Sequence, residues 1–492
     1  MSGNIGASTL WFLFFPALCG AALFCFGKRT LVAQWVNLLF NIIWSVMFLQ
    51  LWNMRPTSDM AFPVVYRWDW LPFIKSHFSL GLDGLNLPLI GLTVFLSICL
   101  AFYAIGKEKL GSGYLALFSI LNAASVGSLM AADAFAFYVF WEFMLIPMYL
   151  LIGGWGSNNR VYASLKFFAF TMAGSLLMLI AILALAYIAN VPSLEWVDIR
   201  SHKTSFDGAW HSLQGLIFLG FLIAFAVKIP IWPLHSWLPD AHTEAPTGAS
   251  VILAGVLLKL GVYGIARWCI PLYPDAAQAA ASVMMTLGCL GIVLGAFAAW
   301  TQTDIKKMIA YSSVSHLGFM VLGLFALNVE GLQGAMFQNL AHGLSTGALF
   351  LIFGIIYERT HTRDIKEYGG MAQNSAVLAS MFVFASLASI GLPGLPGFVG
   401  EFLVLNGSFM TSKTATFVAL SGVLLGAIYM LSLLRRMIYG PVSSHVSHHP
   451  VKPTWNEWVA VVPFILAMLL LGLAPQNVLQ QVSSSVTNVL AR

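Results

Sequence analysis

Residues 225–250 read FAVKIPIWPLHSWLPDAHTEAPTGAS, and the apolar run that leads into this stretch ends in a lysine, Lys228. Prolines, histidines and carboxylates follow where a helix would otherwise continue. Proline removes a backbone donor and interrupts a helix. In a membrane, an interrupted helix is tolerated only where protein or water covers the freed backbone groups. The stretch therefore predicts a broken membrane helix with a buried charge beside the break.

The composition of the whole chain agrees with a membrane protein. Of 492 residues, 59% are hydrophobic and 9% are charged, whereas about a quarter of the residues of a soluble domain are charged. No polar segment is long enough to fold separately, so residues 1–492 are predicted to form one all-α polytopic membrane domain. Apolar runs of about 20 residues predict fourteen spans. They lie near 4–26, 31–52, 84–105, 112–131, 134–154, 165–189, 211–233, 246–268, 277–299, 307–327, 332–357, 376–406, 415–437 and 456–474.

The distribution of Lys and Arg predicts how these spans are oriented. An even number of spans places both termini on one side of the membrane. If that side is non-cytoplasmic, the inside loops hold about twice as many Lys and Arg as the outside segments, as the positive-inside rule requires. The net charge of +5 then reflects topology and indicates no nucleic-acid partner.

The residues that commonly hold cofactors do not indicate one here. The five cysteines show no Cys-x-x-Cys spacing, which iron–sulfur clusters and attached haem groups use. We therefore expect no redox cofactor in this chain. Other possible metal ligands fall in two predicted loops, Asp240/His242/Glu244 and His445/His448/His449. We assign no metal to either group, and a solvated loop explains the second.

Several charged residues lie where lipid is expected. Glu142 is central in DAFAFYVFWEFMLIPMYLL, and Lys259 is central in SVILAGVLLKLGVYGIARW. Lys228, near a helix end, could alone reach the membrane surface through its long side chain. Charges at membrane depth are expensive and usually mark an ion or proton pathway. Because burial and pairing shift proton affinity in opposite directions, these residues are predicted to load and release a proton. Asp83, in GLDGLNLP, is instead predicted to cap a helix N-terminus.

Two histidines and a second broken helix extend this pattern. His316 and His342 fall within predicted spans, beside Ser, Thr or Asn, and histidine can pass a proton near neutral pH. Each could also be a histidine that is simply hydrogen-bonded within a helix bundle. The long span 376–406 is interrupted by GLPGLPG at 391–397, and Glu401 follows. Its Pro-x-x-Pro spacing repeats that of residues 228–233, and broken helices at corresponding positions mark ion sites in transporters.

Four segments together resemble a known family: VFWEFMLIPMYLLIGGWG, KIPIWPLHSWLPDAHTEAPTGASVILAGVLLKLGVYG, DIKKMIAYSSVSHLGFM and GLPGLPGFVGEFLVL. They are similar to the antiporter-like membrane subunits of respiratory complex I, the proton-pumping NADH:quinone oxidoreductase. Glutamate at Glu401 implies the branch called subunit M or chain 4, because sister subunits and the closest antiporter subunit usually carry lysine there. The chain is also expected to lack the long lateral helix of the distal subunit. The plastoquinone-reducing photosynthetic relative resembles the same residues.

The resemblance implies a fold and a set of site residues. The implied fold has fourteen helices with broken helices and two inverted five-helix repeats, at approximately 112–268 and 277–437. Glu142 and Lys228 would form an interacting pair, Lys259 would be the central relay on a broken span, and Glu401 would be the terminal residue. The implied hydrated polar axis contains His235, His316 and His342.

The resemblance also implies partners and an activity. This chain would move protons along buried Glu, Lys and His residues, coupled to electron transfer in other subunits. NADH, FMN, iron–sulfur clusters and quinone would be bound by partner subunits of the membrane and peripheral arms, and the neighbouring antiporter-like subunits would contact this chain in a bacterial inner membrane. The alternative is a subunit of a multi-subunit cation/proton antiporter. A purely structural subunit would not explain charges that cost stability at membrane depth.

Overall fold

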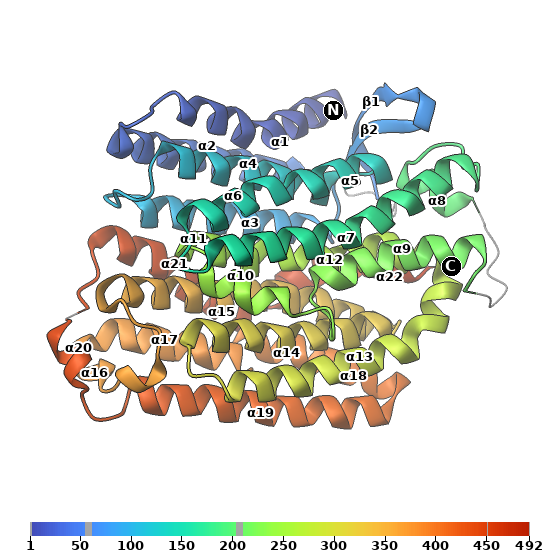
Figure 1. Cartoon of the computed structure of the whole chain (residues 1–492). Coiled ribbons are helices and arrows are strands. Elements are labelled where there is room, and N and C mark those ends of the chain that lie inside the picture. Colours follow the sequence, from blue (N-terminus) through green and yellow to red (C-terminus); the bar gives the residue numbers. More distant parts are fainter. Residues whose placement is uncertain (1, 55–61, 203–209, 450, 492) are drawn as a thin grey trace.

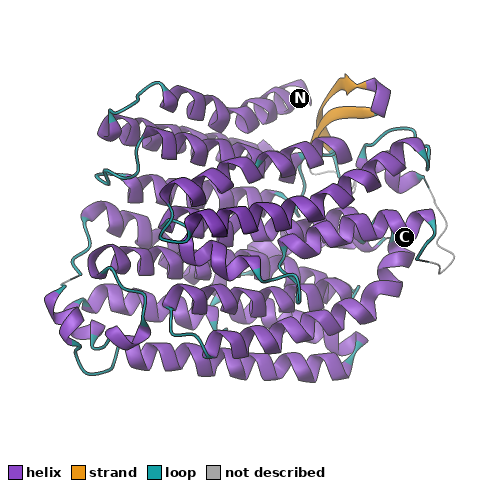
Figure 2. Ribbon diagram, viewed as in Figure 1, coloured by secondary structure: helices purple, strands orange, loops and turns teal. Residues whose placement is uncertain are grey.

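The computed structural model describes residues 2–54, 62–202, 210–449 and 451–491. The long helices run side by side in one bundle (Figure 1), and Figure 2 shows that the strands among these residues are confined to one small hairpin. In the first half the helices are α1 (Ser2–Phe24), α2 (Thr30–Met54), α3 (Leu87–Ala104), α4 (Ser112–Met130), α5 (Ala134–Phe143), α6 (Leu145–Trp155), α7 (Arg160–Tyr187), α8 (Trp196–Ser201), α9 (Leu213–Lys228) and α10 (Trp237–Glu244). The next membrane helix consists of α11 (Thr247–Ile252), η2 (Leu253–Leu257), α12 (Leu258–Gly264) and η3 (Ile265–Cys269).

The second half has a similar series of helices. They are α13 (Pro274–Trp300), α14 (Ile305–Phe325), α15 (Val329–Thr360), α16 (Met371–Asn374), α17 (Ala376–Ser389), α18 (Pro396–Thr411), α19 (Lys413–Met437), α20 (Ser444–His448), α21 (Trp455–Leu473) and α22 (Gln476–Leu490). Two 3-10 turns, η1 (Pro72–Ile74) and η4 (Ile365–Glu367), complete the helical elements of the described residues.

The predicted spans are confirmed. In the described part of the chain, 12 helices are long and apolar enough to cross a membrane. Of the other two predicted spans, 211–233 contains α9, which α10 continues after a break, and 376–406 contains α17 and the first part of α18. Residues 112–268 and residues 277–437 each contain five spans, and the fourth of each five is the broken one.

Proline and glycine explain where the second broken helix stops. Helix α17 ends at Ser389, and α18 begins at Pro396. Between them, Gly391 and Gly394 have φ angles of +74° and +90°, which glycine adopts without the steric cost that other residues meet. Pro396 occupies the first turn of α18, where its missing N–H costs nothing. The sequence GLPGLPG therefore both ends one half-helix and begins the next.

The two ends of the bundle differ. Strands β1 (Val64–Leu71) and β2 (Ser76–Gly81) pair antiparallel and lie at the same end as both termini and α8 (Figure 1). We call this the hairpin end, and the end that carries α16 and α20 the α20 end. That both termini share one end agrees with the even number of spans. The hairpin and the polar-faced helix α22 were not among the predicted elements.

Asp83 was predicted to cap a helix N-terminus, and its hydrogen bonds at the start of α3 confirm this prediction. The residue before α3 is Asn86, but the Asp83 carboxylate accepts hydrogen bonds from the backbone N–H groups of Leu85 and Asn86, at 3.0 and 3.2 Å. The backbone oxygen of Asp83 accepts from the N–H of Leu87 over 3.1 Å, which completes the pattern of an N-cap. The second carboxylate oxygen of Asp83 pairs with Arg267, which is 184 residues away in the chain. Local sequence could not reveal this partner.

Candidate functional site

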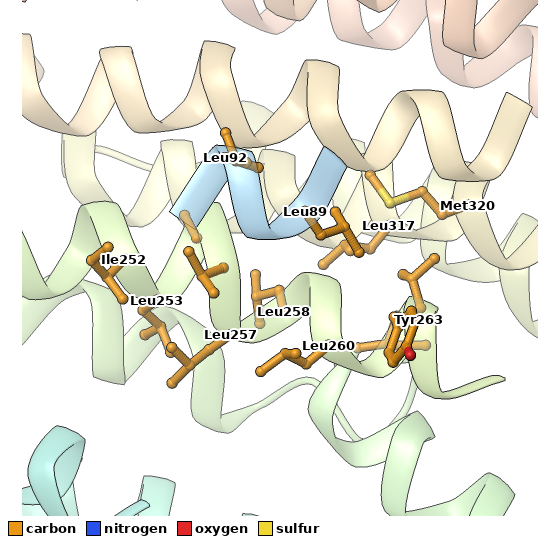
Figure 3. Close-up of a cluster of buried hydrophobic side chains, with 14 of the residues drawn as sticks. Leu89, Leu92, Ile252, Leu253, Leu257, Leu258, Leu260, Tyr263, Leu317 and Met320 are labelled. Carbon is orange, nitrogen blue, oxygen red and sulfur yellow. The ribbon is translucent and has the colours of Figure 1, made fainter. Parts of the chain in front are cut away.

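Lys259 lies at the centre of the bundle. It is 1% exposed, and it lines a small cavity together with Leu89, Leu92 and Leu260. These three leucines belong to the cluster of buried apolar side chains that Figure 3 shows. The Lys259 helix was expected to be broken, but it is continuous: two π-helical segments, η2 and η3, flank α12 instead. Such segments are frequent at functional sites.

The side chain of Lys259 begins a chain of contacts that crosses the bundle. Its Nζ is in direct contact with Nδ1 of His342 on α15. The His342 ring lies 5.5 Å, centroid to centroid, from that of His316 on α14. His316 Nδ1 is 3.1 Å from Oε1 of Glu401 on α18. Four residues that were predicted from the sequence are therefore brought together, and all four are buried.

Three neighbouring side chains that the sequence analysis did not select hold this series of contacts in place. The Gln338 side-chain amide donates to Glu401 Oε1 over 3.2 Å, and Ser389 Oγ lies 3.3 Å from His316 Nε2. The Asn339 amide donates to the backbone oxygen of Lys259 over 3.3 Å. Gln338 is four residues before His342, so the two share one face of a helix. That spacing was the signal in the sequence that could have identified it.

The break in the second half makes room for Glu401. A Cβ atom at Gly391 would lie 2.9 Å from Glu401 Oε2, closer than the van der Waals contact of two such atoms. Glycine at 391 thus permits both the backbone turn and the position of the carboxylate.

Glu142 and Lys228 are near one another but do not touch. The Nζ of Lys228 and the Oε1 of Glu142 have no hydrogen-bond partner among the described residues. The ammonium group of Lys228 lies 5.0 Å from the centre of the Trp141 ring and 5.8 Å from that of Phe167. Aromatic faces attract a cation, so they take the place of the expected carboxylate contact. The charges of Lys228 and Glu142 still interact through space.

The helix that carries Glu142 is interrupted close to that residue. Helix α5 ends at Phe143 and α6 begins at Leu145. Pro147 lacks the N–H that would bond to the carbonyl of Phe143, and its ring crowds that carbonyl. The interruption, at Met144, therefore lies two residues after Glu142.

His235 lies apart from the chain of contacts that starts at Lys259. Its ring packs edge-on against Tyr311, with a centroid distance of 6.3 Å. Nearby, Lys166 and Asp240 form an ion pair of 2.7 Å. His235 Nδ1 has no hydrogen-bond partner within the residues that the structure covers. His235 is thus on the α20 side of the first broken helix, between α10 and α14.

His242 is another buried histidine, and it lies near Lys259. It is fully buried and stacks on Phe350 at 4.6 Å, and its charge neighbours are Lys259 and Lys306. Within the described ranges, no group of three or more His, Cys, Asp or Glu side chains could hold a metal ion.

Comparisons with known proteins place these features in a family. The NADH:quinone oxidoreductase/Mrp antiporter transmembrane family matches residues 131–427, a range that includes Glu142 and Glu401. NADH-quinone oxidoreductase subunit M of Rickettsia conorii is 38% identical over 467 residues, which cover 95% of this chain and 94% of the relative. The chain belongs to the subunit M family of NADH-quinone oxidoreductases. Subunit M of Escherichia coli K12 is 37% identical, with 94% of this chain and 93% of that protein covered.

Solved structures agree with this assignment to the subunit M family. A chain of respiratory complex I from Thermus thermophilus with bound NADH superimposes with a TM-score of 0.87 at 30% identity, covering 98% of this chain and 99% of that one. A chain of the Mrp complex from Dietzia sp. also gives a TM-score of 0.87, but at 21% identity, over 99% of this chain and 97% of that one. The second match shows a shared fold only. The subunit M family that Glu401 implied is therefore confirmed.

Proposed function

We propose that this subunit M chain translocates protons along Lys259, His342, His316 and Glu401, coupled to NADH:quinone oxidoreduction in other subunits. The observation that carries the proposal is the series of contacts from Lys259 to Glu401, in which the adjacent rings of His342 and His316 join the Lys259–His342 and His316–Glu401 pairs. Even when they are paired, buried titratable groups stabilise a fold no more than apolar side chains would, so four of them in a row favour a functional role.

The chemistry of the four groups suits a relay. A proton leaving Nζ of Lys259 meets the imidazole of His342, which can accept it on one nitrogen. Histidine changes charge near neutral pH, so it can hold a proton briefly and pass it on. The ring of His316 lies between His342 and the carboxylate of Glu401. Glu401 is the last acceptor in this series, and its other bond, from Gln338, keeps Oε1 directed at His316.

Glu142 and Lys228 would control the relay through their charges. When electron transfer elsewhere moves Lys228 relative to Glu142, the proton affinity of each changes, because interacting groups titrate as a pair. The changed field at Lys259 would then favour release of its proton to His342. His235, on the α20 side, would belong to the path by which protons approach the bundle.

We further infer that residues 112–268 and 277–437 are two inverted repeats. The broken fourth span in each set of five supports this inference. The expected membrane is the bacterial inner membrane, with both termini on the non-cytoplasmic side. Neighbouring antiporter-like subunits would contact this chain, and the NADH, FMN, iron–sulfur and quinone sites would lie in other subunits.

The first test uses Lys259→Ala and Glu142→Gln in the intact complex. NADH-driven proton uptake and NADH:quinone turnover are measured together in inverted membrane vesicles. We expect both rates to fall in each variant while the complex remains assembled. Normal proton uptake in Lys259→Ala would refute the relay.

A control separates a redox-driven pump from a gradient-driven antiporter. Vesicles with the reconstituted complex receive a sodium gradient without NADH, and internal pH is followed. A redox-driven pump predicts no cation-dependent proton movement under these conditions. Exchange of sodium for protons without NADH would instead favour the antiporter function.

A further inference from the structure

The Lys259 helix carries a buried arginine toward the hairpin end. Lys259, Tyr263 and Arg267 follow one another at intervals of four residues, and eight residues of helix span about 12 Å. Arg267 is 0% exposed, and its Nη2 lies 2.5 Å from Oδ2 of Asp83. This ion pair therefore lies between Lys259 and the hairpin end of the bundle.

Tyr263 occupies the space between Lys259 and the ion pair. Its hydroxyl donates to the backbone oxygen of Leu129 over 2.8 Å and accepts from Nε of Arg267 over 3.2 Å. The hydroxyl hydrogen is thus committed to a carbonyl, away from Lys259. To carry a proton from Lys259, Tyr263 would first have to break this bond.

Aromatic side chains enclose the arginine. The Phe62 ring is 3.9 Å from the guanidinium carbon of Arg267, and the Trp196 ring is 5.8 Å from it. The Trp196 indole N–H donates to the backbone oxygen of Arg267 over 2.7 Å. Asp83 is held in turn by two backbone N–H groups of its own loop. The pair is therefore fixed and closed from solvent.

The charge at this point repels protons. A guanidinium does not lose its proton in proteins, so it cannot act as a relay, and fixed positive charges exclude protons and cations from narrow paths. Arg200 adds a second positive charge at this end: burial and the nearby charge of Arg267 lower the pKa of Arg200. Arg200 itself bonds to the C-terminal backbone, at Asn488 and Ala491.

At the hairpin end, the described part of the second half of the chain has neutral hydrogen-bonding groups in place of an ion pair. There Ser408 and Thr416 share a hydrogen bond of 2.9 Å, the Thr411 hydroxyl donates to Ala326 O over 2.9 Å, and the Asn328 amide donates to Gly407 O over 2.7 Å. These groups are neutral and can exchange partners with water. Among the described residues, no ion pair closes this end of α14, α18 and α19.

We propose that the Asp83–Arg267 pair closes the direct route from Lys259 to the hairpin end, so that a proton on Lys259 leaves through His342 toward Glu401. The pair determines the direction of transfer and takes no proton itself. This proposal rests on the proposed relay function.

The test measures passive proton flux through the whole complex in liposomes, with an imposed pH gradient and no NADH. Arg267→Met removes the fixed charge and leaves Asp83 as a possible acceptor, so the flux should rise by about 10- to 1,000-fold. Adding Lys259→Met should return the flux to the wild-type level, because the leak passes through Lys259. Asp83→Asn breaks the ion pair but keeps the arginine, and it should not leak.

Three results would overturn the proposal. These are an assembled Arg267→Met complex without a leak, an equal leak in Asp83→Asn, or a leak that Lys259→Met does not remove. The last two would indicate loosened packing. If Arg267→Met does not assemble, Arg267→Gln serves with the same expectation, since it keeps N–H donors for Asp83. Because the flux is measured without NADH, its outcome is independent of whether Lys259→Met alone abolishes NADH-driven pumping.

Discussion

The replacement Gly391→Ala should disconnect Glu401 from the relay while leaving the fold intact. The new Cβ would lie 2.9 Å from Glu401 Oε2, and the carboxylate is the flexible end of a side chain, so it should move rather than the backbone. Its Oε1 is 3.1 Å from His316 Nδ1, near the limit of a good hydrogen bond. A shift of a few tenths of an ångström is enough to break that contact.

The size of the effect follows from the bond that is lost. A hydrogen bond to a charged group contributes about 1.5–3 kcal/mol. At about 1.4 kcal/mol per factor of ten, losing it lowers the population of the connected arrangement at least about tenfold. NADH-driven proton uptake in inverted vesicles should fall by a similar factor if this contact limits the rate.

Gly394→Ala is the matched control for this experiment. Gly394 has a φ of +90°, and no atom lies within 4 Å of the position that a Cβ would take there. Both variants therefore carry the backbone cost of a side chain at positive φ, about 1–2 kcal/mol, but only Gly391→Ala displaces the carboxylate. Equal proton uptake by the two variants, with equal assembly, would refute the reasoning.

Two further predictions concern stability, measured as the thermal unfolding midpoint of the purified complex in detergent. Lys107 contacts Glu358 and lies 3.0 Å from Glu457, which is 2% exposed. Lys107→Met should destabilise the fold by about 1–3 kcal/mol because it weakens the pairing of a buried carboxylate. The control, Lys109→Met at an exposed site, should have little effect. Asp133 is fully buried, and its carboxylate accepts from the first turn of α5 and from two groups of β2. Asp133→Ala should cost about 2 kcal/mol, and Asp133→Asn should cost less because it keeps an acceptor oxygen; an equal loss in both would exclude this explanation.

The sequence predicted the spans well because burial in lipid requires long apolar runs, and the breaks because proline and glycine act locally. It also selected Lys259, His342, His316 and Glu401, since charge at membrane depth is conspicuous in any apolar run. Their contacts with one another could not be predicted from the sequence, because they join residues of four different helices.

What could not be predicted depends on residues distant in sequence. Asp83 has an ordinary capping sequence, and its pairing with Arg267 is set by how α3 packs against the Lys259 helix. Lys228 was expected to meet Glu142, yet its ammonium lies over Trp141 and Phe167. The local sequence predicts neither contact, because the folded geometry decides whether a carboxylate or an aromatic ring lies next to a given cation.

The π-helical segments on either side of Lys259 have a consequence for genetic change. Each residue of a helix turns the chain by about 100°, and a π segment holds one residue more per turn than an α-helix. Deleting one residue from η2 could restore ordinary helix geometry and leave α11 and α12 nearly in register, whereas one further inserted residue would rotate α12 by that angle and turn Lys259 away from His342. Single-residue deletions within residues 253–257 should therefore be more frequent among functional alleles than single-residue insertions there.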